Sequence, residues 1–222
     1  MNNSNDPKPL VKQDLMKQLV SDHCIGAPDA VIILLEYGDY EDQTSANAQP
    51  LVRHLIETFG DQMKLIYRHY PLIEIHPHAE LAAEAAEAAA AQGRFWEMHD
   101  LLFRNSVHLN LKALQSYAER LELDMSRFKA EMDDRIYLQR VKEHRHSGEL
   151  LDLRESPTFF LNGKTIDISF GLERLEDAVF ELVKKLYTSH CKLPEGSSDP
   201  SAGNALAPCH RQLSLHTFDM AF

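Results

Sequence analysis

The chain has 222 residues, 44% of them hydrophobic and 26% charged, which is typical of a globular protein with a sizeable core. Its formal net charge is −11, and no cluster of Lys and Arg offsets it, so nucleic acid is excluded as an expected partner. No run of about 18 apolar residues occurs and the amino end lacks the apolar core of a secretory signal, so we expect a cytoplasmic protein with no membrane partner.

The three cysteines are Cys24, Cys191 and Cys209. Their number is odd and their spacing is wide, so the sequence does not indicate a disulfide framework. We expect all three to be reduced thiols.

The first core elements follow a polar arm. Residues 1–21 are predicted to form this arm, and the continuous apolar run 31–35 is typical of a strand buried on both faces. A helical pattern then extends to Gly60, the expected C-terminal cap, and Asp42 is predicted to cap its start. The apolar positions of this helix are Leu51, Val52, Leu55, Ile56 and Phe59.

The second strand is predicted at residues 63–69, where apolar and polar residues alternate. It should lie beside the first strand, because a strand–helix–strand crossover has this spacing. An Ala-rich helix follows at 79–91, and His76 is expected to cap it. Its acidic residues are predicted to form a solvated face; they are Glu80, Glu84 and Glu87.

Residues 95–149 have helical patterns throughout. Asn110 is predicted to cap a helix that ends near Leu121, and Ser126 to cap a longer one that carries Phe128, Met132, Ile136 and Val141. A β-hairpin is predicted at 158–168 around Asn162-Gly163, and a last helix at 172–186. The segment 188–222 is rich in Pro, Gly and Ser, which predicts a disordered tail.

Three stretches of the chain resemble the DsbA-like branch of thioredoxin-fold thiol–disulfide oxidoreductases. They are DHCIGAPDAVIILLEYGDYE, HPHAELAAEAAEAAAAQGRFWEMHDLLF and SPTFFLNGK, in the order that the family has them. The resemblance implies an α/β, thioredoxin-like fold over residues 22–187, with a helical insert at about 77–150.

The resemblance fails at the family's redox motif. Where that family has Cys-x-x-Cys, this chain has Asp42, Gln43, Thr44 and Ser45. Disulfide exchange requires a thiolate and a second thiol to resolve the mixed disulfide, so the degenerate site should be redox-inactive. A plain helix cap at Asp42 is the alternative interpretation, and whether the chain is an enzyme stays open.

Ser156-Pro157 matches the family's cis-proline loop, which implies a backbone that pairs with an extended ligand, with Tyr40 as a further ligand contact. One hypothesis is a peptide or partner protein bound without chemistry. The alternative is a glutathione-dependent oxidoreductase or transferase that uses Ser45 or Thr44, as a serine does in the kappa-class glutathione transferases. Because an anionic Asp42 should repel an ionised thiol, we rank binding first; no cofactor is predicted apart from a possible glutathione.

The histidines show no His-x-x-x-His spacing, so no metal site is predicted from the sequence. They are expected to be capping or surface residues; those considered are His76, His78, His99, His144 and His146. A Cys₂His₂ site from His190-Cys191 and Cys209-His210 is disfavoured by the long Pro/Gly/Ser segment between the two pairs.

Overall fold

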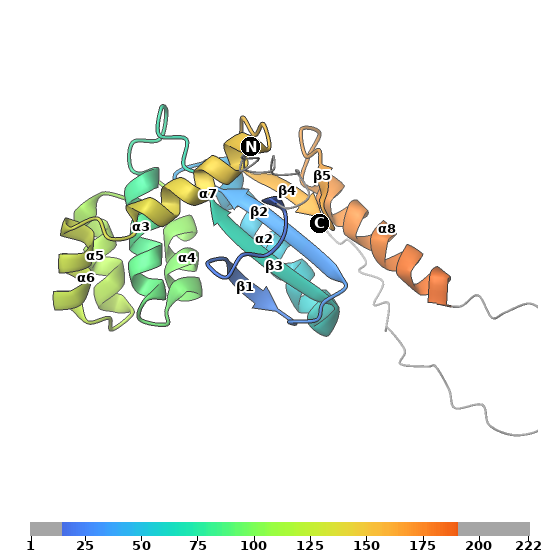
Figure 1. Cartoon of the computed structure of the whole chain (residues 1–222), viewed down its shortest axis with the longest axis horizontal. Coiled ribbons are helices and arrows are strands. Elements are labelled where there is room, and N and C mark those ends of the chain that lie inside the picture. Colours follow the sequence, from blue (N-terminus) through green and yellow to red (C-terminus); the bar gives the residue numbers. More distant parts are fainter. Residues whose placement is uncertain (1–14, 191–222) are drawn as a thin grey trace, which may run out of the picture.

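The computed structural model describes residues 15–190. A five-stranded mixed sheet has the order β1-β3-β2-β4-β5. Figure 1 shows the sheet between a group of helices on one side, α3 to α6, and the last helix, α8, on the other. The α/β, thioredoxin-like fold class is therefore confirmed.

The strands are β1 (His23–Gly26), β2 (Ile32–Gly38), β3 (Met63–His69), β4 (Thr158–Leu161) and β5 (Lys164–Ile166). β2 and β3 are parallel neighbours, as predicted from the crossover, and the other pairs are antiparallel. Every residue of β3 is buried, and this includes its polar residues Lys64, Arg68 and His69. β1 was not predicted, and Cys24 lies within it, paired with Ile66 of β3.

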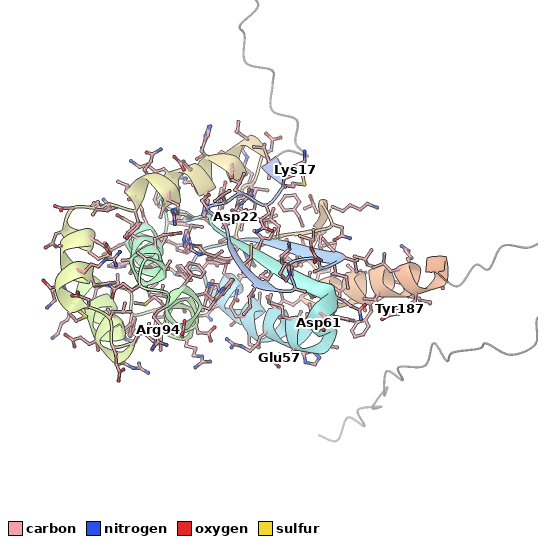
Figure 2. All side chains as sticks on the ribbon, turned by 60° about the horizontal axis from the view of Figure 1, so that its bottom comes forward. Lys17, Asp22, Glu57, Asp61, Arg94 and Tyr187 are labelled. Atoms are coloured by element: carbon pink, nitrogen blue, oxygen red, sulfur yellow. The ribbon has the colours of Figure 1, made fainter. Side chains whose placement is uncertain are left out.

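The arm before β1 is fastened to β3 by Arg68. Its guanidinium donates to both carboxylate oxygens of Asp22 at 2.8 Å and to the Lys17 carbonyl at 2.8 Å. The side chains of Arg68 and Asp22 are both fully buried, and Figure 2 shows Asp22 beside the strands. An ion pair that is this deeply buried needs such bidentate geometry to offset its desolvation.

Helix α2 (Gln43–Phe59) has the predicted ends. Asp42 is its N-cap, and Gly60 ends it with a φ of 46°, a left-handed conformation that glycine adopts readily. Its apolar face packs on the sheet with α8 (Glu173–His190) in one core cluster. That cluster includes Ile32, Val52, Leu55, Phe159 and Val179.

The helical segment between β3 and β4 contains α3 (Ala79–Ala90), α4 (Phe95–Arg104), α5 (Leu111–Arg120), α6 (Met125–Asp133) and α7 (Leu138–Leu150). Asn110 caps α5, as predicted, with its side chain accepting from Ala113 N. The long helix predicted from Ser126 is wrong: Asp124 caps α6, and the chain breaks at Arg135 before α7 begins. Arg135 has a φ of 51°, and this turn directs its guanidinium to Glu80 and Glu84 of α3.

Two expectations about α3 are also wrong. His76 does not cap the helix, because α3 begins after His78 and has no side-chain cap. Glu84 and Glu87 do not form a solvated face, since they are 1% and 0% exposed and pair with basic side chains. The i, i+4, i+7 spacing showed only that these carboxylates share one side of the helix. The turn at Arg135 and the packing of α7 decide that this side is covered.

The hairpin is confirmed, with positive φ angles at both Asn162 (46°) and Gly163 (77°), the pattern of a type I′ turn. The last predicted helix is α8, and it extends to His190. The arm up to residue 14 and the predicted tail from residue 191 lie outside the described residues. Within residues 15–190, none of the helices combines the length and the apolar character that crossing a membrane requires.

Candidate functional site

Three segments meet at one edge of the sheet. β2 and β3 end side by side, with Gly38 paired to His69, and β4 begins beside them, with Thr158 paired to Tyr37. The first turn of α2 follows β2 directly, and Ser156-Pro157 directly precedes β4. The sheet register therefore brings the degenerate motif and the proline loop together, as the resemblance implies.

The carboxylate of Asp42 is the centre of this edge. It accepts hydrogen bonds from Thr44 N at 3.2 Å, from Ser45 N at 2.8 Å and from the Ser45 hydroxyl at 2.8 Å. Its negative charge lies at the positive end of the α2 dipole, where it is stabilised. The Ser156 hydroxyl also donates to Asp42 Oδ2, at 3.2 Å. Asp42 is thus more than a plain cap, because it links the helix to the loop that carries the cis Ser156–Pro157 bond.

The other residues of the motif differ in exposure. Ser45 is fully buried, and its hydroxyl lies between Asp39 N at 3.4 Å and the Asp42 carboxylate. Gln43 and Thr44 are exposed, and Gln43 donates to Asn47 one turn along the helix. A hydroxyl as enclosed as that of Ser45 is not available to position a thiol ligand.

Cys24 is the free cysteine among the described residues. It lies on β1 opposite Ile66, away from the edge where β3 ends at His69. Burial, and then the neighbouring charge of Asp22, raise the pKa of its thiol, so it is a poor source of thiolate. Among residues 15–190, no pair of thiols therefore lies at the start of α2.

The expectation that Tyr40 contacts a ligand is corrected by the burial of its side chain. Tyr40 is only 1% exposed, its hydroxyl lies 3.1 Å from His99 Nδ1, and its ring centroid lies 4.7 Å from that of Phe103. Its side chain turns into the core of the helical segment, where a large aromatic residue gains most from burial. His99 and His144 are likewise buried, so the expectation of capping or surface histidines is wrong for these two.

Asp39 holds a second loop against this edge, which the sequence analysis did not anticipate. Its carboxylate accepts from Leu72 N at 2.8 Å and lies 2.8 Å from His76 Nδ1. Burial raises the pKa of Asp39, while the hydrogen bonds from Leu72 and His76 act against that rise. The tethered loop exposes two apolar side chains next to the start of α2: Ile73 is 44% exposed and Ile75 is 68% exposed.

Glu36 is a fully buried carboxyl group on β2, and the sequence analysis also missed it. It accepts from Gln49 Nε2 at 2.7 Å, whereas its second oxygen has no partner among the described residues. Burial raises its pKa to about 8, against the smaller opposing effect of the Gln49 hydrogen bond. A signal was present in the sequence, because Glu36 is the one charged residue in the run Ile32–Gly38.

The strand–helix junction, the loop with its cis proline and the helical segment between β3 and β4 together define a DsbA-like protein of the thioredoxin fold. A family model described as Thioredoxin matches residues 18–192, and the chain belongs to this family. Among solved structures, Wolbachia pipientis alpha-DsbA1 aligns with a TM-score of 0.68 at 18% identity, over 81% of this chain and 100% of that one. A thioredoxin-like oxidoreductase from Silicibacter pomeroyi aligns with a TM-score of 0.64 at 22% identity, over 73% of this chain and 92% of that one.

The curated relatives that match this chain are named as antiporters and not as oxidoreductases. The chain is 42% identical over 158 residues to "Na(+)/H(+) antiporter NhaA 1" of Salinispora arenicola, a match that covers 71% of this chain and 24% of that protein. It is 36% identical over 164 residues to "Na(+)/H(+) antiporter NhaA" of Herminiimonas arsenicoxydans, covering 74% and 26%. The chain thus spans about a quarter of the length of these relatives, so the activity in their names is not assigned to it.

Proposed function

We propose that this protein binds an extended segment of a polypeptide along the Ser156-Pro157 loop and carries out no disulfide exchange there. The proposal rests on the Asp42 carboxylate. It occupies the start of α2 and already accepts hydrogen bonds from Thr44, Ser45 and Ser156. A site filled in this way offers neither a nucleophilic sulfur nor free N–H groups for an anionic thiol.

The Ser156 main chain supplies the recognition. Within residues 15–190 its N–H and C=O groups form no hydrogen bond, and the residue lies two positions before Thr158, the first residue of β4. An extended peptide that pairs there makes strand-like hydrogen bonds, which recognise backbone shape. Ile73 and Ile75 offer apolar contact on the neighbouring loop, a feature that suits a polypeptide better than glutathione.

Glutathione-dependent chemistry ranks second. It needs a hydroxyl that faces the ligand, and Ser45 is buried under Asp42. Thr44 is exposed, but the negative charge of Asp42 next to it disfavours an ionised thiol.

The test uses a fluorescently labelled, reduced and carboxymethylated insulin B chain, with binding followed by fluorescence anisotropy. We expect saturable binding, no heat on titration with glutathione and no turnover in an insulin-reduction assay. Ser156→Pro removes the main-chain N–H and should abolish binding, whereas Ser156→Ala keeps it and should bind. Ile75→Asp should weaken binding, and Ile136→Asp, which changes an isoleucine that is 56% exposed ahead of α7, should not.

Two results would overturn the proposal. One is measurable insulin reduction by the wild-type protein. The other is equal binding by Ser156→Pro and Ser156→Ala, which would show that the main chain of this loop is not the contact.

A further inference from the structure

Three side chains, one each from β1, β3 and α3, converge on the side of the sheet where α3 lies. His23 Nε2 of β1 lies 2.8 Å from Glu87 Oε1 of α3, and His69 Nε2, at the end of β3, lies 2.9 Å from the same oxygen. The three potential donor atoms all lie within 4.8 Å of one another. His69 and Glu87 are buried and His23 is partly exposed.

We propose that His23, His69 and Glu87 form a binding site for a divalent transition metal ion, with Zn²⁺ as the best fit. Two imidazole nitrogens and one carboxylate oxygen are a donor set that Zn²⁺ favours and that Mg²⁺ and Ca²⁺ do not. Metal–donor distances of about 2.0–2.2 Å place tetrahedral donors roughly 3.3 Å apart. Each imidazole nitrogen therefore needs to withdraw from Glu87 Oε1 by about half an ångström, starting from 2.8 and 2.9 Å, and the two imidazole nitrogens lie within 4.8 Å of each other.

The surrounding groups hold these donors in place. Arg140 Nη1 donates to Glu87 Oε2 at 2.8 Å, so the other carboxylate oxygen points to the two histidines. The His23 ring stacks on Phe95 with a centroid distance of 3.5 Å and an interplanar angle of 11°. The His69 ring stacks on His144 at 5.5 Å. Outer groups that orient metal ligands in this way contribute to affinity in known sites.

A pocket of about 370 Å³ opens beside the cluster. It is lined by His23 and Glu87 together with Phe95, Trp96, Tyr137 and Arg140. Three protein ligands leave one position of a tetrahedral ion for water or a small ligand, and the pocket supplies the room. His23, with a side chain that is 14% exposed, lies on the route by which an ion would enter. The proposed metal site therefore leaves one coordination position open. It is formed by residues other than Asp42 and Ser156.

The test is calorimetric titration of the metal-stripped full chain with ZnCl₂, supported by the visible absorption of bound Co²⁺. We expect one equivalent to bind with a thermal stabilisation that depends on the metal concentration, because the ion binds the folded state. Glu87→Gln and His23→Gln should each weaken binding by at least about tenfold. His54→Gln, which changes an exposed histidine on α2, is the matched control and should leave the affinity unchanged.

The cysteines are the competing ligands, so the titration is repeated on the triple variant Cys24→Ser, Cys191→Ser, Cys209→Ser. This variant should keep the site. Loss of binding in the triple variant together with retention in His23→Gln would place the metal on thiols and overturn the proposal. Absence of binding by the wild type would overturn it as well. If Glu87→Gln does not fold, His23→Gln decides the outcome, since its side chain lies at the edge of the pocket.

Discussion

Replacing Glu36 by Gln should change how the stability of the protein depends on pH. Burial raises the pKa of this carboxyl group from 4.5 to about 8, so the folded protein holds the proton that the unfolded chain releases. The free energy of unfolding of the wild type should then fall as the pH rises from about 4.5 to about 8. The amide of the Glu36→Gln variant stays neutral, and its carbonyl can keep the hydrogen bond from Gln49, so the variant should escape this loss.

The expected size follows from the pKa shift. Each unit corresponds to about 1.4 kcal/mol, so a shift from 4.5 to about 8 corresponds to roughly 5 kcal/mol. The difference in unfolding free energy between Glu36→Gln and the wild type should grow by about 1.4 kcal/mol per pH unit in this window and level off above it. A change of this size is a large part of the roughly 5–15 kcal/mol that stabilises a typical domain, so it should be readily measured.

Urea unfolding at a series of pH values, followed by circular dichroism, measures this difference directly. Glu119→Gln, which changes an exposed carboxylate on α5, controls for the change in net charge. The reasoning would be refuted if the difference in unfolding free energy between Glu36→Gln and the wild type changed by no more than about the experimental error from about pH 5 to about pH 8. Linkage requires this difference to depend on pH wherever the folded and unfolded states bind different numbers of protons.

Two further predictions concern other sites. The double variant Asp42→Cys, Ser45→Cys should form an intramolecular disulfide and gain insulin-reduction activity, because its first thiol would lie at a helix N-terminus, which lowers the pKa of a thiol. Titration of free thiols measures whether the disulfide forms. Each single variant should stay inactive. Asp22→Ala should destabilise the protein by about 3–5 kcal/mol in urea unfolding, since it leaves the Arg68 guanidinium buried and uncompensated. A loss below about 1 kcal/mol would mean that water reaches Arg68 in the variant.

Features set by neighbouring residues were predictable from the sequence. Asp42 and Gly60 delimit α2, because a short acidic side chain and a glycine satisfy the two ends of a helix within one turn. Asn162-Gly163 specifies a hairpin for the same reason, since both residues adopt positive φ readily. The resemblance then placed Ser156-Pro157 opposite Asp42, a contact that local patterns do not contain.

Features set by distant packing were not predictable. Tyr40 follows β2 just as a ligand contact would, and only the position of α4 shows that its ring is enclosed. The helical spacing predicts Glu87 to be a surface carboxylate of α3, whereas β1, β3 and α7 bring His23, His69 and Arg140 to it. Short spacings between histidines in the sequence do not indicate this cluster, because its side chains come from separate elements.

The pairing of Asp42 with Ser156 bears on what the edge can recognise. The N–H groups of Thr44 and Ser45, the Ser45 hydroxyl and the Ser156 hydroxyl already donate to the Asp42 carboxylate. A ligand cation would have to compete with these four donors, and a ligand anion would meet a negative charge. Neither a cationic nor an anionic side chain of a ligand is therefore favoured here. In the proposed function, the main-chain groups of Ser156, which form no hydrogen bond within residues 15–190, are the point of contact. Because main-chain pairing depends on extended conformation and not on sequence, we expect the proposed surface to select unfolded or flexible segments in preference to one particular motif.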